Sequence, residues 1–208
     1  MPRARALLVA ISGIDGAGKG YVASRVATSL EARGVRVAVL SVDPWLRLPH
    51  ERFDPSDPAL HFYERALRLE EIFATLVLPL RDTRSIRVEA DAAEERATAY
   101  HRRLWEFEDV DVVLLEGIYL FRAPCRRHYD LACWLDCSFE TALDRAIARG
   151  QEGLSREETV RAYRSIYFPA QEIHFARDDP RASADAVLSN DPGRPLAGAV
   201  TAAVVASS

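Results

Sequence analysis

Gly13-Ile14-Asp15-Gly16-Ala17-Gly18-Lys19-Gly20 is the stretch from which the fold of this sequence can be worked out. Residues 6–11 before it are apolar and typical of a strand, and residues 21–30 after it have the apolar spacing of a helix. Glycines let the backbone turn tightly and point its N–H groups at a phosphate, and a helix start favours negative charge. The setting therefore predicts a phosphate-binding loop, or P-loop, in which residues from Gly13 to Tyr21 bind a nucleotide. We expect the Lys19 ammonium to reach its β- and γ-phosphates.

The position after this lysine departs from the usual motif. Ser or Thr normally stands there and holds Mg²⁺ through its hydroxyl, whereas this chain has Gly20. Backbone atoms can still cradle the phosphates, but the metal needs another ligand. A glycine-rich turn that arose by chance is the alternative, which the strand and the helix on either side disfavour.

Composition narrows the class of protein. The chain has 208 residues, of which 49% are apolar, and this predicts one domain with a large core. The net charge of −4 argues against a nucleic-acid partner. No apolar run is long enough to span a membrane, and the basic start leads into a strand rather than a signal peptide. Cys125, Cys133 and Cys137 lack C-x-x-C spacing, which disfavours disulfides and zinc and favours the cytoplasm.

The order of elements predicts the fold class. Strands and helices alternate, so we expect an α/β fold, a three-layer αβα sandwich around a mostly parallel sheet. Residues 44–58 are rich in proline and aspartate and predict a long loop, of a length that favours function. The predicted strands are 6–12, 35–42, 86–90, 111–117, 131–136 and 186–189, and the predicted helices are 19–33, 59–78, 91–107, 139–149, 156–177 and 196–205.

Two acidic residues stand where strands are expected to end. Asp43 follows the second strand and Glu116 ends an apolar strand, and open α/β sheets bind ligands at this edge. Phosphoryl transfer needs a carboxylate that orients the attacking hydroxyl, a role we assign to Asp43. An apolar strand that ends in an acid is typical of a magnesium site, so Glu116 and Asp43 are the candidate metal ligands, acting through water. Either carboxylate could instead cap a turn.

Arginines near residue 150 predict a lid. Arg145 and Arg149 are four residues apart and share a helix face. Gly150 and Gly153 follow, so residues 145–157 could hinge over the nucleotide and neutralise the transferring phosphate. A solvated helix face is an equal alternative.

The proline-rich loop carries candidate substrate ligands. Asp54 and Asp57 could bind vicinal hydroxyls, although turn formation at Asp-Pro explains them better. Four aromatic residues could stack on a planar ring or belong to the core, namely Trp45, Phe53, Phe62 and Tyr63.

Together these pieces resemble the uridine kinase and phosphoribulokinase family of P-loop kinases, over most of the chain. The resemblance rests on residues 11–19, Val42-Asp43-Pro44-Trp45, Phe53-Asp54-Pro55-Ser56-Asp57, Leu115-Glu116-Gly117-Ile118, Arg149-Gly150, and Tyr163 with Phe168-Pro169-Ala170. It implies phosphorylation of a primary hydroxyl of a ribose-like substrate with ATP and Mg²⁺. It also implies that Asp43 is the base, that Asp54 or Asp57 binds the ribose, and that Trp45 and Tyr163 lie on the substrate side.

The departures from this family leave the acceptor open. The region 80–85 lacks the Tyr and His with which uridine kinases read the pyrimidine, and Gln151 replaces a lid arginine. We therefore expect a small-molecule kinase with a nucleoside-like acceptor, with a sugar or a pantothenate-like alcohol as the alternative. A nucleotide-binding regulator without turnover is the rival of a different class, suggested by Gly20. A homo-oligomer is compatible with the sequence.

Overall fold

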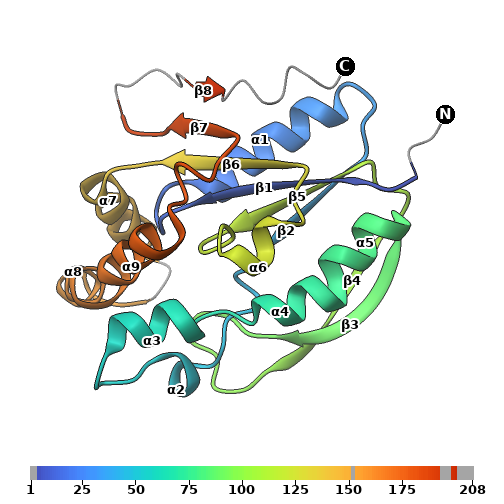
Figure 1. Cartoon of the computed structure of the whole chain (residues 1–208). Coiled ribbons are helices and arrows are strands. Elements are labelled where there is room, and N and C mark those ends of the chain that lie inside the picture. Colours follow the sequence, from blue (N-terminus) through green and yellow to red (C-terminus); the bar gives the residue numbers. More distant parts are fainter. Residues whose placement is uncertain (1–3, 151–152, 193–197, 201–208) are drawn as a thin grey trace.

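A computed structural model describes residues 4–150, 153–192 and 198–200 of the chain (Figure 1). Its main sheet has the strand order β2-β5-β1-β6-β7-β8, in which the first five strands are parallel and β8 is antiparallel to β7. The strands are β1 (Leu7–Gly13), β2 (Val37–Ser41), β5 (Val112–Gly117), β6 (Leu131–Asp136), β7 (Ala186–Ser189) and β8 (Gly198–Val200).

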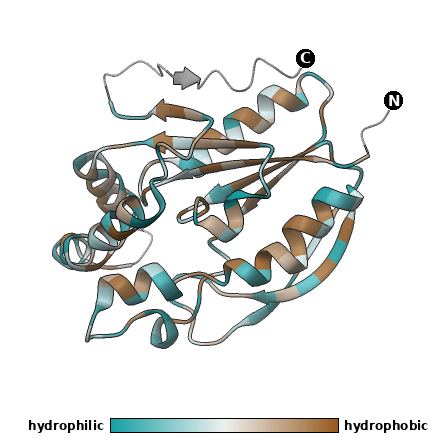
Figure 2. Ribbon diagram, viewed as in Figure 1, coloured by the Kyte–Doolittle hydropathy of each residue, from teal (hydrophilic) through white to brown (hydrophobic). Residues whose placement is uncertain are grey.

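Helices cover both faces of this sheet. Leu7 and Val9 of β1 face a small cluster that includes Ala27 of α1, whereas Leu8 and Ala10 face the larger core on the opposite side. The central strands β1, β5 and β6 are therefore mostly apolar, as Figure 2 shows, because helices cover both of their faces. The helices are α1 (Lys19–Glu31), α2 (Pro49–Arg52), α3 (Pro58–Arg65), α4 (Leu69–Ile72), α5 (Leu78–Thr83), α6 (Ala123–Arg126), α7 (Phe139–Arg149), α8 (Arg156–Ala162) and α9 (Phe168–Asp178).

The predicted three-layer α/β fold with a mostly parallel sheet is confirmed. The predicted bounds of β6, α7 and β7 agree with the structure to the residue, and β1, β2 and β5 differ by two residues or fewer at either end. No helix among the described residues is long and apolar enough to cross a membrane.

The predicted helix over 91–107 is wrong. That segment instead completes β3 (Ile86–Ala92) and forms β4 (His101–Phe107), which pair as a separate antiparallel hairpin. The Trp105 ring lies 5.3 Å from the ring of Trp45 between their centroids, at the core. This buried aromatic contact and the seven-residue pairing of β3 with β4 outweigh the local helix propensity of an Ala-, Glu- and Arg-rich stretch.

The predicted break of the second helix at Pro79 is also wrong. After α3 the chain turns at residues 66–68, and α4, the π-helix η1 (Phe73–Val77) and α5 then follow without interruption. Proline has no N–H to donate four residues back, and the N–H of Leu78 donates to the Phe73 carbonyl in the wider turn. The same device, η2 (Tyr163–Tyr167), precedes Pro169, so α8, η2 and α9 run continuously as the sequence predicts.

Two smaller corrections concern the proline-rich loop and the end of the chain. The 44–58 loop contains the short helix α2. Within the predicted helix 196–205, residues 198–200 form β8, and the other residues lie outside the described part of the chain.

Candidate functional site

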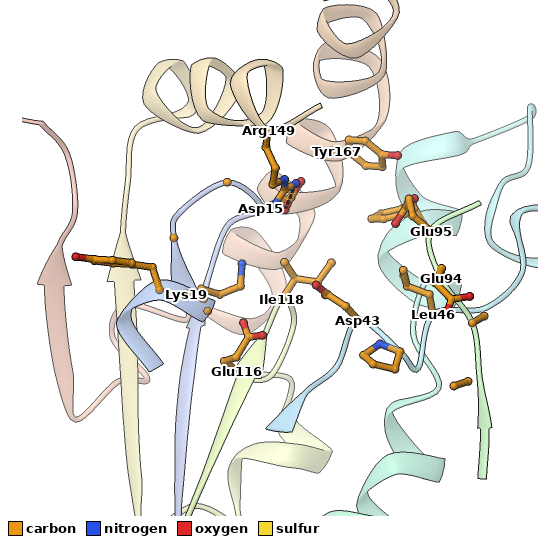
Figure 3. Close-up of a pocket in the computed structure, with 18 of the residues that line it drawn as sticks. Asp15, Lys19, Asp43, Leu46, Glu94, Glu95, Glu116, Ile118, Arg149 and Tyr167 are labelled. Atoms are coloured by element: carbon orange, nitrogen blue, oxygen red, sulfur yellow. Dashed lines mark ion pairs between the residues drawn. The ribbon is translucent and has the colours of Figure 1, made fainter. Parts of the chain in front are cut away.

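A cleft of about 400 Å³ opens at the carboxyl ends of β1, β2 and β5. Lys19, Asp43 and Glu116 line it, and Figure 3 shows all three side chains directed toward one space. The edge is the one at which open α/β sheets bind ligands, and β5 separates β1 from β2 there. The structure therefore brings together the predicted phosphate loop and both predicted acids.

The P-loop has the backbone of an anion cradle. Gly16 and Gly18 have φ angles of 77° and 87°, in the left-handed region, and α1 begins directly afterwards at Lys19. A Cβ at Gly16 would lie 2.5 Å from the Ala142 carbonyl oxygen, so a side chain would not fit. The first N–H groups of α1 have no partner within the helix and are available to a phosphate.

Two residues from distant parts of the chain donate hydrogen bonds to the backbone of this loop. Asn190 donates from Nδ2 to the Ala17 carbonyl at 2.7 Å, and Arg145 donates to the same carbonyl at 3.3 Å. Arg145 also donates to the Asn190 carbonyl at 2.6 Å. The structure thus places Arg145 behind the P-loop, where it supports the backbone, and not among the residues that line the cleft.

Charge in the cleft centres on Lys19. Its side chain is 8% exposed, and its Nζ donates to the Ile14 carbonyl at 2.9 Å. Burial raises the pKa of both Asp43 and Glu116, and the Lys19 ammonium counters this rise in each. One buried cation therefore lies near two carboxylates whose pKa is raised, an arrangement suited to proton transfer and to binding of a cation.

Arg149 and Tyr163 both contact the P-loop acid Asp15. The Arg149 guanidinium lies 3.7 Å from the Asp15 carboxylate, and the Tyr163 hydroxyl donates to it. Arg149 lines the cleft, as predicted, whereas Tyr163 is fully buried and does not. Gly150 ends α7 in a left-handed conformation, and Gly153 has φ 62°. Residues 151–152, and with them the departure at Gln151, lie outside the described residues.

The opposite wall of the cleft comes from the β3–β4 hairpin and the turn that joins its strands. Glu94, Glu95 and Arg103 contribute side chains there. The Glu95 carboxylate pairs at 2.6 Å with Arg52, whose side chain is 2% exposed. These residues were not identified from the sequence, because the sequence predicts a helix over 91–107 and not a hairpin next to the cleft.

Several predicted substrate residues lie elsewhere. Trp45 is fully buried against Trp105 and Arg68, so it is a core residue. Asp57 caps α3 by accepting from the Leu60 N–H, and Asp54 accepts from the N–H and the hydroxyl of Ser56. These two are turn and cap residues, in agreement with the alternative that the sequence favoured, and neither lines the cleft.

Of the four aromatic candidates, only Phe62 lines the cleft. Tyr63 is buried and donates to Asp178 at 2.7 Å. Sequence reasoning missed Tyr167 and Gln171, which lie four residues apart in η2 and α9 and line the cleft beside Phe62. A polar Gln on an otherwise apolar helix face is the signal that could have found the second of them.

The donor set fits a magnesium ion only in part. Asp43 and Glu116 supply carboxylate oxygens, the ligand type that Mg²⁺ prefers. No group of three or more His, Cys, Asp or Glu among the described residues has a geometry that would hold a metal. A Cβ built on Gly20 would lie 3.8 Å from Glu116 Oε1, an ordinary contact distance. A serine hydroxyl would therefore fit there.

This space gives a prediction. We expect Gly20→Ser to lower the Mg²⁺ concentration needed for half-maximal ATP binding by about threefold or more, the effect of about 0.7 kcal/mol from one added ligand. Titration of Mg²⁺ at fixed ATP, followed by calorimetry, measures this. Gly20→Ala is the matched control, because it removes the helix penalty of glycine without adding an oxygen. Equal midpoints in the two variants would show that position 20 does not contribute to the metal.

Comparisons with known proteins agree with this geometry at the level of the fold. A family model described as methylmalonyl Co-A mutase-associated GTPase MeaB matches residues 1–47, the segment that contains the P-loop. A thymidylate kinase of Xanthomonas euvesicatoria pv. vesicatoria (strain 85-10) is 63% identical over 38 residues. That match covers 18% of this chain and 16% of the relative, so it concerns a short segment of both.

Solved structures are similar over most of the chain. A protein of Bacillus stearothermophilus described as a possible uridine kinase superposes with a TM-score of 0.69 at 19% identity, over 90% of each chain. Phosphoribulokinase from Rhodobacter spheroides superposes with a TM-score of 0.63 at 14% identity, over 90% of this chain and 71% of its own. This chain therefore has the fold of the P-loop kinases, as the sequence resemblance implies.

Proposed function

We propose that this protein is an ATP-dependent kinase that transfers the γ-phosphoryl group to a hydroxyl of a small, nucleoside-like acceptor. The observation that carries the proposal is the continuity of the cleft. It runs from the P-loop and Lys19, past Asp43, to a second half lined by Phe62 and the hairpin. A phosphate donor and an acceptor can therefore lie end to end with Asp43 between them.

In this proposal each residue has a defined task. Backbone N–H groups of residues 13–21 bind the ATP phosphates, and Lys19 neutralises charge on the β- and γ-phosphates. The Asp43 carboxylate accepts the proton of the acceptor hydroxyl while the hydroxyl oxygen bonds to the γ-phosphorus and the bond to the β-phosphate oxygen breaks. Mg²⁺, when bound, neutralises phosphate charge, and Glu116 with Asp43 would hold it. On ATP binding, the Arg149 guanidinium would leave its ion pair with Asp15 and pair with a phosphate of ATP.

The remaining expectations form part of the same proposal. ATP and a small alcohol are the partners, nucleic acid and membranes are not, and the cytoplasm is the location that free thiols at Cys125, Cys133 and Cys137 favour. A sugar or a pantothenate-like alcohol is the alternative acceptor. Assembly into a homo-oligomer, and a lid over residues 145–157 that closes on ATP, stay predictions.

A steady-state assay tests the proposal. ATP consumption is measured with a panel of nucleosides, sugars and other polar alcohols, with and without Mg²⁺. A kinase gives Mg²⁺-dependent ADP release that one acceptor increases well above the background. Gly20 is the observation that favours a regulator without turnover, and that function would be indicated by tight ATP binding with no acceptor-dependent turnover.

A further inference from the structure

Gln171 is a buried polar side chain in a wall of the cleft. It is 1% exposed and lines the acceptor half together with Phe62, Tyr167 and Ile118. Both polar atoms of its amide, Nε2 and Oε1, lack a hydrogen-bond partner among the described residues. Both atoms are closed off from solvent in this structure. A small rotation of the side chain at the cleft wall would present two donor hydrogens and an acceptor oxygen to an occupant.

An amide in this position is costly unless something binds it. Buried polar groups are nearly always paired, because removal from water without a new partner is unfavourable. A leucine of similar size would fill the same space without that cost. The unpaired amide is thus better explained by a ligand than by packing.

The fold directs this residue at the site. The π-helix η2 adds one residue to the helical turn before Pro169. This extra residue sets the direction of the helix face that Tyr167 and Gln171 share. The rings of Tyr167 and Phe62 lie 4.9 Å apart between centroids, which makes this wall aromatic. The Gln171 amide is therefore set in apolar surroundings, where its hydrogen bonds would discriminate strongly.

We propose that Gln171 is a specificity-determining residue that binds the non-reacting end of the acceptor, and that this end carries an uncharged carboxamide or imide. The inference rests on the proposed kinase function for the identity of the reaction. An amide presents a donor next to an acceptor, which matches the Gln side chain. A polyol would leave several hydroxyls unpaired against the aromatic wall.

Binding and turnover are measured separately to test this. The probes are uridine for an imide, nicotinamide riboside for a carboxamide, ribitol for an amide-free alcohol, and ribose 5-phosphate for an anion. Each is titrated by thermal shift in the presence of ADP and assayed for acceptor-dependent ATP consumption. The variants are Gln171→Leu and, as a matched control, Tyr119→Phe, which removes a buried unpaired hydroxyl that does not line the cleft.

We expect uridine or nicotinamide riboside to bind more tightly than the other two probes. Gln171→Leu should weaken that binding, and lower kcat/KM, by about 10-fold or more, the effect of two lost hydrogen bonds. Its affinity for ATP should equal that of the wild type, and its Tm without ligand should be equal or higher, because two unpaired polar atoms are removed. Tyr119→Phe should bind the probes as the wild type does.

Three results would overturn the assignment. They are a preference for ribitol or ribose 5-phosphate, amide-probe binding that changes less than twofold in Gln171→Leu, and a fall in Tm that accounts for the loss. Failure of the kinase proposal has a different signature. In that case an amide probe still binds with ADP in a Gln171-dependent manner, but no ATP is consumed.

Discussion

Replacement of Asp43 by Asn is expected to lower kcat by at least about 100-fold, the usual size of a lost general base. The substitution preserves shape and removes the negative charge, and with it the ability to accept a proton. ATP affinity should change little, because the P-loop backbone and Lys19 are untouched. Rapid-quench measurement of ADP formation with a saturating acceptor gives kcat, and calorimetry gives the ATP affinity. An unchanged kcat would remove Asp43 from the mechanism.

The same substitution should raise stability, with a defined pH dependence. Burial raises the pKa of Asp43 above its ordinary value of 3.8. The folded state therefore binds the proton more tightly than the unfolded chain, and this contribution to stability is lost as pH rises through the folded pKa. Asn never ionises, so Asp43→Asn should have a higher Tm than the wild type at pH 7–8, by a small margin because the Asp43 side chain is exposed to solvent. Below pH 3.8 this difference should disappear.

Ionisation of Asp43 should lower stability but raise activity. The base acts only when deprotonated, so kcat of the wild type should fall as pH drops through the raised pKa of Asp43. Glu116, whose pKa burial also raises, contributes to the same limb of the profile. Glu116→Gln should therefore shorten the pH range over which kcat falls on the acidic side, and the part of the fall that depends on Asp43 should remain.

Replacement of Lys19 by Ala is expected to weaken ATP binding by about 10- to 150-fold, the range for a lost hydrogen bond to a charged group. Lys19 is 8% exposed, so solvent screens its charge poorly. The variant also loses the cation that counters the raised pKa of Asp43 and Glu116. The acidic limb of the kcat profile should consequently move to higher pH.

Lys19→Arg is the matched control for this prediction. It keeps the positive charge and should leave the acidic limb near its wild-type position, while the wider guanidinium weakens phosphate binding by geometry. Calorimetric titration with ATP compares all three proteins. If Lys19→Ala bound ATP as tightly as the wild type, the glycine loop would not be the phosphate site.

Local sequence signals explain which elements could be predicted. The bounds of α7 follow from Ser138, which caps the helix by accepting from the Thr141 N–H, and from Gly150 in a left-handed conformation. The P-loop and the acids that follow β2 and end β5 were predictable because glycines and strand ends carry their own conformational signature. The sequence accordingly located the residues that the structure brings together at Lys19, Asp43 and Glu116, and their roles in phosphate binding and catalysis stay predictions.

The acceptor half depends on contacts between distant residues, which local patterns do not encode. The hairpin forms because Trp105 packs on Trp45 and because Arg68 donates to the Asp91 carbonyl at 2.7 Å. Aromatic character predicted a binding role for Trp45, and the family resemblance implied one for Tyr163, but both side chains are fully buried. Whether a large side chain faces a ligand or the core is decided by tertiary packing and not by its type.

The separate β3–β4 hairpin has a consequence for the evolution of this protein. It forms one wall of the cleft, and among the described residues it shares no strand pairing with the sheet that carries the P-loop. If the proposed kinase function holds, insertions or exchanges within residues 93–100 can change which acceptors bind while the P-loop is inherited unchanged. A lineage built on this scaffold can acquire new substrates by changing a single peripheral module.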